Sequence, residues 1–110
     1  MLKITIDDSD YVIELESVLD NKLKSIEKEQ FAEIWITGHG TSAFCILKNN
    51  SQAFLLYLRE NGDSGFSSRN KDGNKTKLIE FKLSNGQYDE YPENSVVSYK
   101  KLKKLSPNIV

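Results

Sequence analysis

The first residues of the chain alternate between apolar and polar side chains. Leu2, Ile4 and Ile6 are each separated by one polar residue, which is the period of a strand with one buried face. A polar segment then ends this strand. Ser9 or Asp10 can cap a following helix, because side-chain oxygens at that position accept the unpaired N–H groups of a first helical turn.

An apolar stripe with helical spacing comes next. Its members are three or four positions apart: Val12, Leu15, Leu19, Leu23 and Ile26. Acids are concentrated in the first half of this segment and lysines in the second half, which is the order that suits a helix dipole. We therefore predict an amphipathic helix that packs on the sheet.

The middle of the chain has the pattern of strands. Residues 31–37 and 41–47 flank a short glycine-containing loop at 38–40, which predicts a hairpin. Residues 53–58 are apolar on both faces, and we place this strand centrally in the sheet with the helix on one side.

Two further strands and a helix complete the predicted order. Residues 77–83 alternate, and Asn85-Gly86 favours a two-residue hairpin turn, so that 87–91 pairs back. Ser98 can cap a short terminal helix with outward lysines. The predicted fold class is α+β, an antiparallel β-sheet with an N-terminal helix packed on it and a short C-terminal helix.

Composition adds a charge asymmetry to this fold. The chain has 110 residues, 38% hydrophobic and 28% charged, which is typical of one globular domain. Six acids lie in the first twenty residues, whereas the last fifteen carry four lysines and no acid. We expect no signal peptide, no membrane segment and a cytoplasmic location, because no apolar run is long enough.

Few residues are candidates for catalysis. Residues 62–65 read GDSG, the motif around the nucleophilic serine of trypsin-like proteases, but these are turn formers at the end of a strand. His39 is the chain's single histidine and Cys45 its single cysteine, so neither a second base nor a zinc ligand set is available. We expect Cys45 to be buried, and we expect no metal, no cofactor and no enzymatic activity.

Two acidic segments are candidate partner-binding surfaces, because aromatic anchors and complementary charge carry much of the recognition at interfaces. The N-terminal candidates are Asp7, Asp8, Asp10, Glu14 and Glu16. The second group interleaves acids with aromatic residues and consists of Tyr88, Asp89, Glu90, Tyr91 and Glu93. For this second group, a half-buried strand with ordinary solvent charges is the alternative. His39, between two glycines, is a further candidate contact.

The terminal lysines lie on one short amphipathic segment in a slightly acidic chain, so we interpret them as a solvated helix face and expect no nucleic-acid binding.

The order of motifs over residues 43–105 resembles the first-numbered Imm family of bacterial immunity proteins, which accompany polymorphic and contact-dependent growth inhibition toxins. The positions that carry the resemblance are Ala53, Leu55, Tyr57, Gly65, Ser68, Phe81, Gly86, Pro92, Val97 and Ser98. The family pattern continues into a segment with glycine, proline and tryptophan, of which this chain has only Pro107. The resemblance implies an α+β fold without enzymatic activity that binds one toxin domain, often a nucleic-acid deaminase or nuclease.

These observations lead to one hypothesis and two alternatives. An acidic inhibitor surface can occupy the basic groove of a toxin that acts on nucleic acid. The two acidic segments are equally good candidates for that surface. The alternatives are a non-toxin interaction module of the same fold and a small nuclease that uses His39 with lysines.

Overall fold

The computed structural model describes residues 2–13, 16–38, 40, 42–60 and 62–104. It is mostly antiparallel β-sheet with two α-helices, which confirms the α+β class. The elements in chain order are β1 (Leu2–Ile6), β2 (Ser9–Ile13), α1 (Glu16–Ser25), β3 (Phe31–Thr37), β4 (Ala43–Asn49), β5 (Gln52–Leu58), β6 (Phe66–Ser67), β7 (Leu78–Lys82), β8 (Tyr88–Pro92), a 3₁₀ turn (Glu93–Ser95), β9 (Val97–Ser98) and α2 (Tyr99–Lys103).

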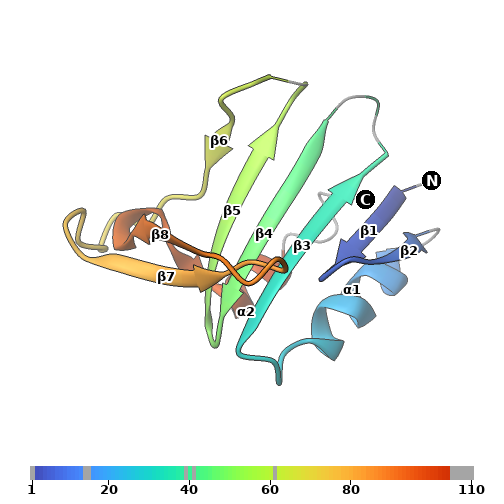
Figure 1. The fold of residues 1–110 in the computed structure, drawn as a ribbon, viewed down its shortest axis with the longest axis horizontal. Coiled ribbons are helices and arrows are strands. Elements are labelled where there is room, and N and C mark those ends of the chain that lie inside the picture. The colour runs from blue at the N-terminus through green and yellow to red at the C-terminus, as the bar shows by residue number, and fades with distance from the viewer. Residues whose placement is uncertain (1, 14–15, 39, 41, 61, 105–110) are drawn as a thin grey trace.

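One large sheet organises the fold. Its strand order is β2-β1-β3-β4-β5-β6, and β9 also pairs with β5. Strands β7 and β8 form a separate two-stranded hairpin that crosses in front of the large sheet, while α1 and α2 lie behind it (Figure 1). The β1–β2 hairpin therefore lies at one edge of the large sheet, and β6 and β9 lie at the other.

The start of the helix is the main correction to the sequence-based fold. Ser9 and Asp10 do not cap a helix; they belong to β2, which pairs back on β1, so α1 follows two strands and begins at Glu16. Asp7 and Asp8 form the turn, with positive φ angles of 45° and 75°. Such turns usually contain glycine or asparagine, because other residues are strained there, so Asp7-Asp8 is a weak sequence signal for a hairpin turn.

The predicted hairpins are present. Strands β3 and β4 pair antiparallel around the 38–42 connection, and β5 has paired neighbours on both edges, as its apolar pattern predicts. The turn of the β7–β8 hairpin is one residue longer than expected. Leu83 and Gln87 close a three-residue loop that ends in Gly86, whose φ is 89°.

The two faces of the large sheet bury separate clusters. Helices α1 and α2 and the turn after α1 cover one face through Leu19, Leu23, Ile26, Tyr99 and Leu102. The β7–β8 hairpin covers part of the other face. The buried residues on that side are Cys45, Leu47, Phe54, Ile79, Phe81 and Val96. The apolar strand β5 contributes to both clusters, with Ala53 on the helix side and Phe54 on the hairpin side.

Ser98 caps α2 as predicted, because its Oγ accepts a hydrogen bond of 3.0 Å from the Lys101 N–H. The Tyr99 hydroxyl donates to the Leu23 carbonyl at 2.6 Å and ties α2 to α1. No helix in the described part of the chain is long and apolar enough to cross a membrane.

Candidate partner-binding surface

The β1–β2 turn holds its acids in fixed positions. The Asp7 N–H donates to the Glu33 carbonyl at 3.0 Å, and the Asp7 Oδ1 accepts from the Glu33 N–H at 2.9 Å. The Asp10 Oδ1 accepts from the Thr5 hydroxyl at 2.7 Å. Hydrogen bonds therefore hold this turn against β3. They also fix the orientation of the Asp7 and Asp10 carboxylates.

Ser84 joins the β1–β2 turn to the β7–β8 hairpin. Its N–H donates to the Glu33 Oε1 at 3.1 Å, and its hydroxyl lies 3.4 Å from both the Asp8 Oδ1 and the Glu33 Oε1. The other carboxylate oxygen of Glu33 accepts from the Trp35 indole N–H at 2.9 Å. The N-terminal acidic segment therefore lies against the tip of the β7–β8 hairpin, whose second strand carries most of the other predicted segment.

The outer face of the hairpin carries two acids, and Lys82 lies on the same face directly opposite Tyr88, with its Nζ 6.0 Å from the centre of that ring. Glu90 is directly opposite Glu80 across the two strands, and both side chains are exposed. Like charges opposite each other in a hairpin are unfavourable for folding. Tyr88 is 52% exposed, and its ring packs edge-on against Phe31 of β3 at a centroid distance of 6.1 Å.

Two other residues of the second predicted segment make contacts within the protein. Tyr91 is half-buried and stacks on Phe54 with ring centroids 3.9 Å apart. Burial raises the pKa of Tyr91 to about 12. Glu93 accepts from the Asn74 N–H at 3.0 Å and pairs with the Lys77 Nζ at 3.3 Å, and these hydrogen bonds lower its pKa. Tyr91 and Glu93 therefore stabilise the hairpin and its adjacent loop.

The structure describes only some of the remaining residues that the sequence predicts as partner contacts. Glu14 and His39 lie outside the described residues. Glu16 begins α1, but its side chain also lies outside the description. Asp89 is half-buried, with its carboxylate 3.3 Å from the Tyr91 hydroxyl.

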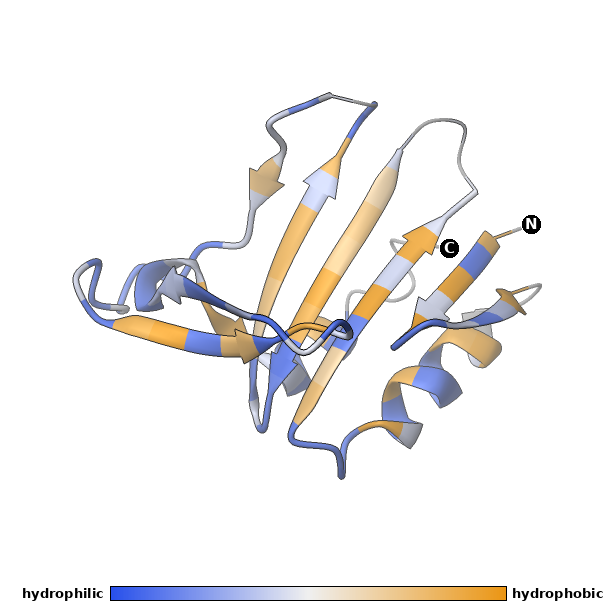
Figure 2. Ribbon diagram, viewed as in Figure 1, coloured by the Kyte–Doolittle hydropathy of each residue, from blue (hydrophilic) through white to orange (hydrophobic). Residues whose placement is uncertain are grey.

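We call the combined region the acidic surface. Its members come from the β1–β2 turn, β2, β3 and the outer face of the β7–β8 hairpin, and they are Asp7, Asp8, Asp10, Glu33, Glu80, Tyr88 and Glu90, whereas Asp89 faces the large sheet. Figure 2 shows hydrophilic residues at the β1–β2 turn and at the tip of the hairpin that crosses in front of β3. Sequence reasoning missed Glu33 and Glu80, because each occupies an outward position of an alternating strand and has no local signal of its own.

The catalytic candidates do not assemble into a site among the residues described. Asp63 of the GDSG motif accepts hydrogen bonds from the Arg59 backbone N–H and Nε at 3.0 and 3.1 Å. These bonds hold the pKa of Asp63 down at about 2. The β5–β6 connection that contains Ser64 is thus a turn, as predicted.

The described residues form neither a metal site nor a reactive thiol. Burial raises the pKa of the Cys45 thiol to about 12, so it is not a thiolate nucleophile at neutral pH. The described residues contain no group of three or more histidine, cysteine or acidic side chains arranged to hold a metal ion.

No protein-family model matches this sequence, and no curated protein matches it either.

Proposed function

We propose that this protein is an immunity protein that binds one cognate bacterial toxin domain in a 1:1 complex and neutralises it in the cytoplasm without being an enzyme. The proposal rests on the motif resemblance over residues 43–105 and on the acidic surface. The single observation that carries it is the contact of Ser84 with Asp8 and Glu33, because that contact places the tip of the β7–β8 hairpin beside the N-terminal acids.

The charge of this surface suggests which toxins it suits. A nuclease or nucleic-acid deaminase needs a basic groove for the phosphate backbone of its substrate. An acidic inhibitor surface competes for that groove and accelerates encounter through long-range attraction. Because Asp7, Asp10 and Glu33 are already held by hydrogen bonds, little conformational entropy is lost when the toxin binds.

Tyr88 provides an anchor within the acidic surface. It is exposed, its ring packs edge-on against Phe31, and the Glu80–Glu90 pair lies next to it on the outer face of the hairpin. Aromatic side chains in such positions contribute a large share of interface energy. We place Tyr88 at the centre of the contact, with Glu80 and Glu90 beside it and Lys82 directly opposite it on the hairpin.

The proposal is tested by co-expressing the chain with the toxin domain encoded by the neighbouring reading frame. Growth rescue and co-purification of a 1:1 complex are expected. A double variant, Asp8→Asn with Glu90→Gln, should rescue less well. The matched control, Asp20→Asn with Glu60→Gln, removes the same charge outside the acidic surface, from a half-exposed helix residue paired with Lys24 and from an exposed loop residue, and should rescue fully.

Absence of both rescue and complex, with the two proteins folded, would contradict the proposal. The interaction module that binds a non-toxin protein or peptide would then be the better account, since it uses the same fold and surface.

A further inference from the structure

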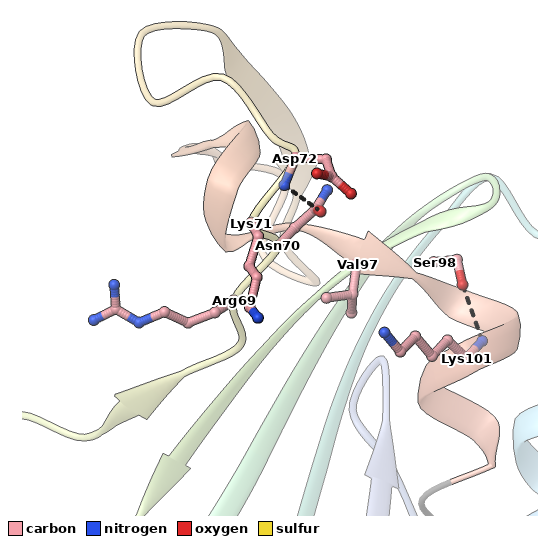
Figure 3. Close-up of a pocket in the computed structure, with 7 residues that line it drawn as sticks. All are labelled: Arg69, Asn70, Lys71, Asp72, Val97, Ser98 and Lys101. Atoms are coloured by element: carbon pink, nitrogen blue, oxygen red, sulfur yellow. Dashed lines mark hydrogen bonds between the residues drawn. The ribbon is translucent and has the colours of Figure 1, made fainter.

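A small cavity lies at the edge of the large sheet farthest from the β1–β2 turn. It has a volume of about 310 Å³ and lies between the loop after β6 and the β9–α2 segment. Seven residues line it: Arg69, Asn70, Lys71, Asp72, Val97, Ser98 and Lys101 (Figure 3). Three of them are cations and one is an acid, so this cavity has the opposite charge to the acidic surface.

The loop that forms one wall is fixed to the body of the protein. The Ser68 hydroxyl donates to the Ser95 carbonyl at 2.5 Å and accepts from the Leu55 N–H at 3.1 Å. The Asn70 N–H donates to the Asn94 carbonyl at 2.7 Å. Gly73 packs so closely that an added Cβ would lie 2.5 Å from the Glu93 carbonyl oxygen. Hydrogen bonds and close packing therefore hold this loop against the body of the protein.

The cations of the cavity are not neutralised within the described part of the protein. Its ion pairs involve Lys24, Arg59, Lys77 and Lys103, and none involves Arg69, Lys71 or Lys101. Figure 3 shows Lys101 extending from α2 toward Val97, on the side of the loop, whereas Arg69 points away from the other side chains. The nearby carboxylate, Asp72, is held in a turn in which its N–H donates to the Asn70 Oδ1 at 3.2 Å.

We propose that this cavity binds the phosphate group of a small molecule, and that a diphosphate is the simplest ligand. Lys71, Lys101 and the Ser98 hydroxyl supply donors of the kind that bind phosphate oxygens. A second cavity of about 480 Å³ shares Arg69, Asn70 and Lys71 and adds Lys75, so a second anionic group has a place to bind.

A small ligand fits these cavities better than a polynucleotide does. No aromatic side chain lines either cavity within the described residues, whereas single-stranded nucleic acid is usually held by base stacking on such side chains. The acidic surface on the same small protein would also repel a long polyanion. The inference is independent of the proposed immunity function, and its test requires no toxin.

The test is a titration of the full chain with pyrophosphate at low ionic strength, followed by amide NMR. The amides of Asn70, Lys71, Ser98 and Lys101 are expected to shift together. Lys71→Gln and Lys101→Gln should each raise the dissociation constant about tenfold, since each removes a charge-assisted hydrogen bond. Lys104→Gln makes the same change on the terminal segment outside the cavity and should alter it by less than about twofold.

Three results would overturn the proposal. The first is the absence of any shift at these amides up to about 10 mM pyrophosphate, an affinity too weak for a built site. The second is an equal loss of affinity in the Lys104→Gln control, which would indicate diffuse attraction. The third is tighter binding of a DNA or RNA oligonucleotide than of pyrophosphate, with shifts spread along α2, which would indicate a nucleic-acid surface.

Discussion

Lys48 is a charged residue that the fold buries almost completely, with 1% of its surface exposed. Its Nζ donates to the Glu29 carbonyl and lies 5.3 Å from the centre of the Tyr99 ring. Burial lowers the pKa of Lys48. The folded state therefore carries a cost for the charged amine, which the carbonyl and the aromatic face only partly offset.

Replacing Lys48 by Met should leave the free energy of unfolding unchanged or raise it by about 1 kcal/mol, because a similar volume is buried without a charge. In the native protein the pKa of Lys48 is lower in the folded state than in the unfolded state. The cost is thus present at neutral pH and is relieved as the pH rises toward the unfolded pKa. Urea denaturation at neutral and alkaline pH should show that this contribution of Lys48 to the free energy of unfolding, which rises with pH in the native protein, is absent from the Met variant.

The matched control is Lys100→Met, at an exposed position of α2. A loss of more than about 2 kcal/mol on Lys48→Met, with no loss in the control, would show instead that the hydrogen bond to Glu29 outweighs the cost of burial.

Asp8 combines backbone strain with a place in the acidic surface. Its φ is 75°, and its carboxylate lies 3.4 Å from the Ser84 hydroxyl. Asn tolerates this backbone region and keeps an oxygen that can accept from Ser84. We expect Asp8→Asn to change the free energy of unfolding by less than about 0.5 kcal/mol and to slow association with the toxin domain.

Denaturant unfolding and stopped-flow association on the same preparation check the Asp8→Asn prediction. Destabilisation by more than about 1 kcal/mol would mean that the charge of Asp8 serves the turn rather than a partner.

At the scale of elements, the β7–β8 hairpin depends on its contact with the large sheet. A two-stranded hairpin is marginally stable alone. Here Ile79, Phe81 and Tyr91 pack against Phe54 and Cys45, and this buried cluster holds the hairpin in place. The position of Ser84 beside Asp8, and therefore the acidic surface, depends on that packing.

This packing makes the hairpin sensitive to alkaline pH. The pKa values of Cys45 and Tyr91 are both raised to about 12, so the unfolded chain loses these protons at a lower pH than the folded chain. Stability should fall as the pH rises from about 9 toward 12, because the unfolded state gains the free energy of ionisation. Tyr91→Phe keeps the ring on Phe54 and should make this decline less steep.

Unfolding curves collected across the alkaline range, with Tyr88→Phe as the exposed control, measure the effect. If the free energy of unfolding of the native protein and of Tyr91→Phe fell identically with rising pH, ionisation of Tyr91 would not be a cause of the alkaline loss of stability.

The sequence predicted the elements that carry their own signal. Alternation located β1 and β3, Asn85-Gly86 located the β7–β8 turn, and Ser98 located the start of α2. Strand β2 was missed because Val12 lies three residues before Leu15 and fitted a helical stripe. Val12 is in fact exposed on β2. Strands β6 and β9 have two residues each and are defined by pairing with β5 rather than by their own sequence.

The candidate surface was predicted only in part, for two physical reasons. Tyr88 and Tyr91 are three residues apart, so on a strand they must point to opposite faces, and the alternation could have separated the exposed ring from the buried one. The contact of the hairpin tip with the β1–β2 turn and Glu33 could not have been found in this way. It depends on hydrogen bonds between Ser84 and residues 51 and 76 positions away, which no local pattern encodes.

At the scale of the whole molecule, the charge asymmetry of the sequence becomes an asymmetry in space. The acids of the β1–β2 turn lie at one edge of the large sheet. The cations of the 69–75 loop and α2 lie near the other edge, where β9 pairs with β5. A protein with such separated charge orients itself in the field of a charged partner before contact. We therefore expect association with a basic toxin domain to weaken as salt is added.

The most direct test is the dissociation constant of the complex with the toxin domain, measured by calorimetry at low and high salt. Asp8→Asn with Glu90→Gln should weaken binding about tenfold at low salt, and the difference from the native protein should shrink at high salt. The control pair, Asp20→Asn with Glu60→Gln, should bind like the native protein. Equal affinity of all three proteins, or binding that does not respond to salt, would contradict the claim that the acidic surface recognises the toxin.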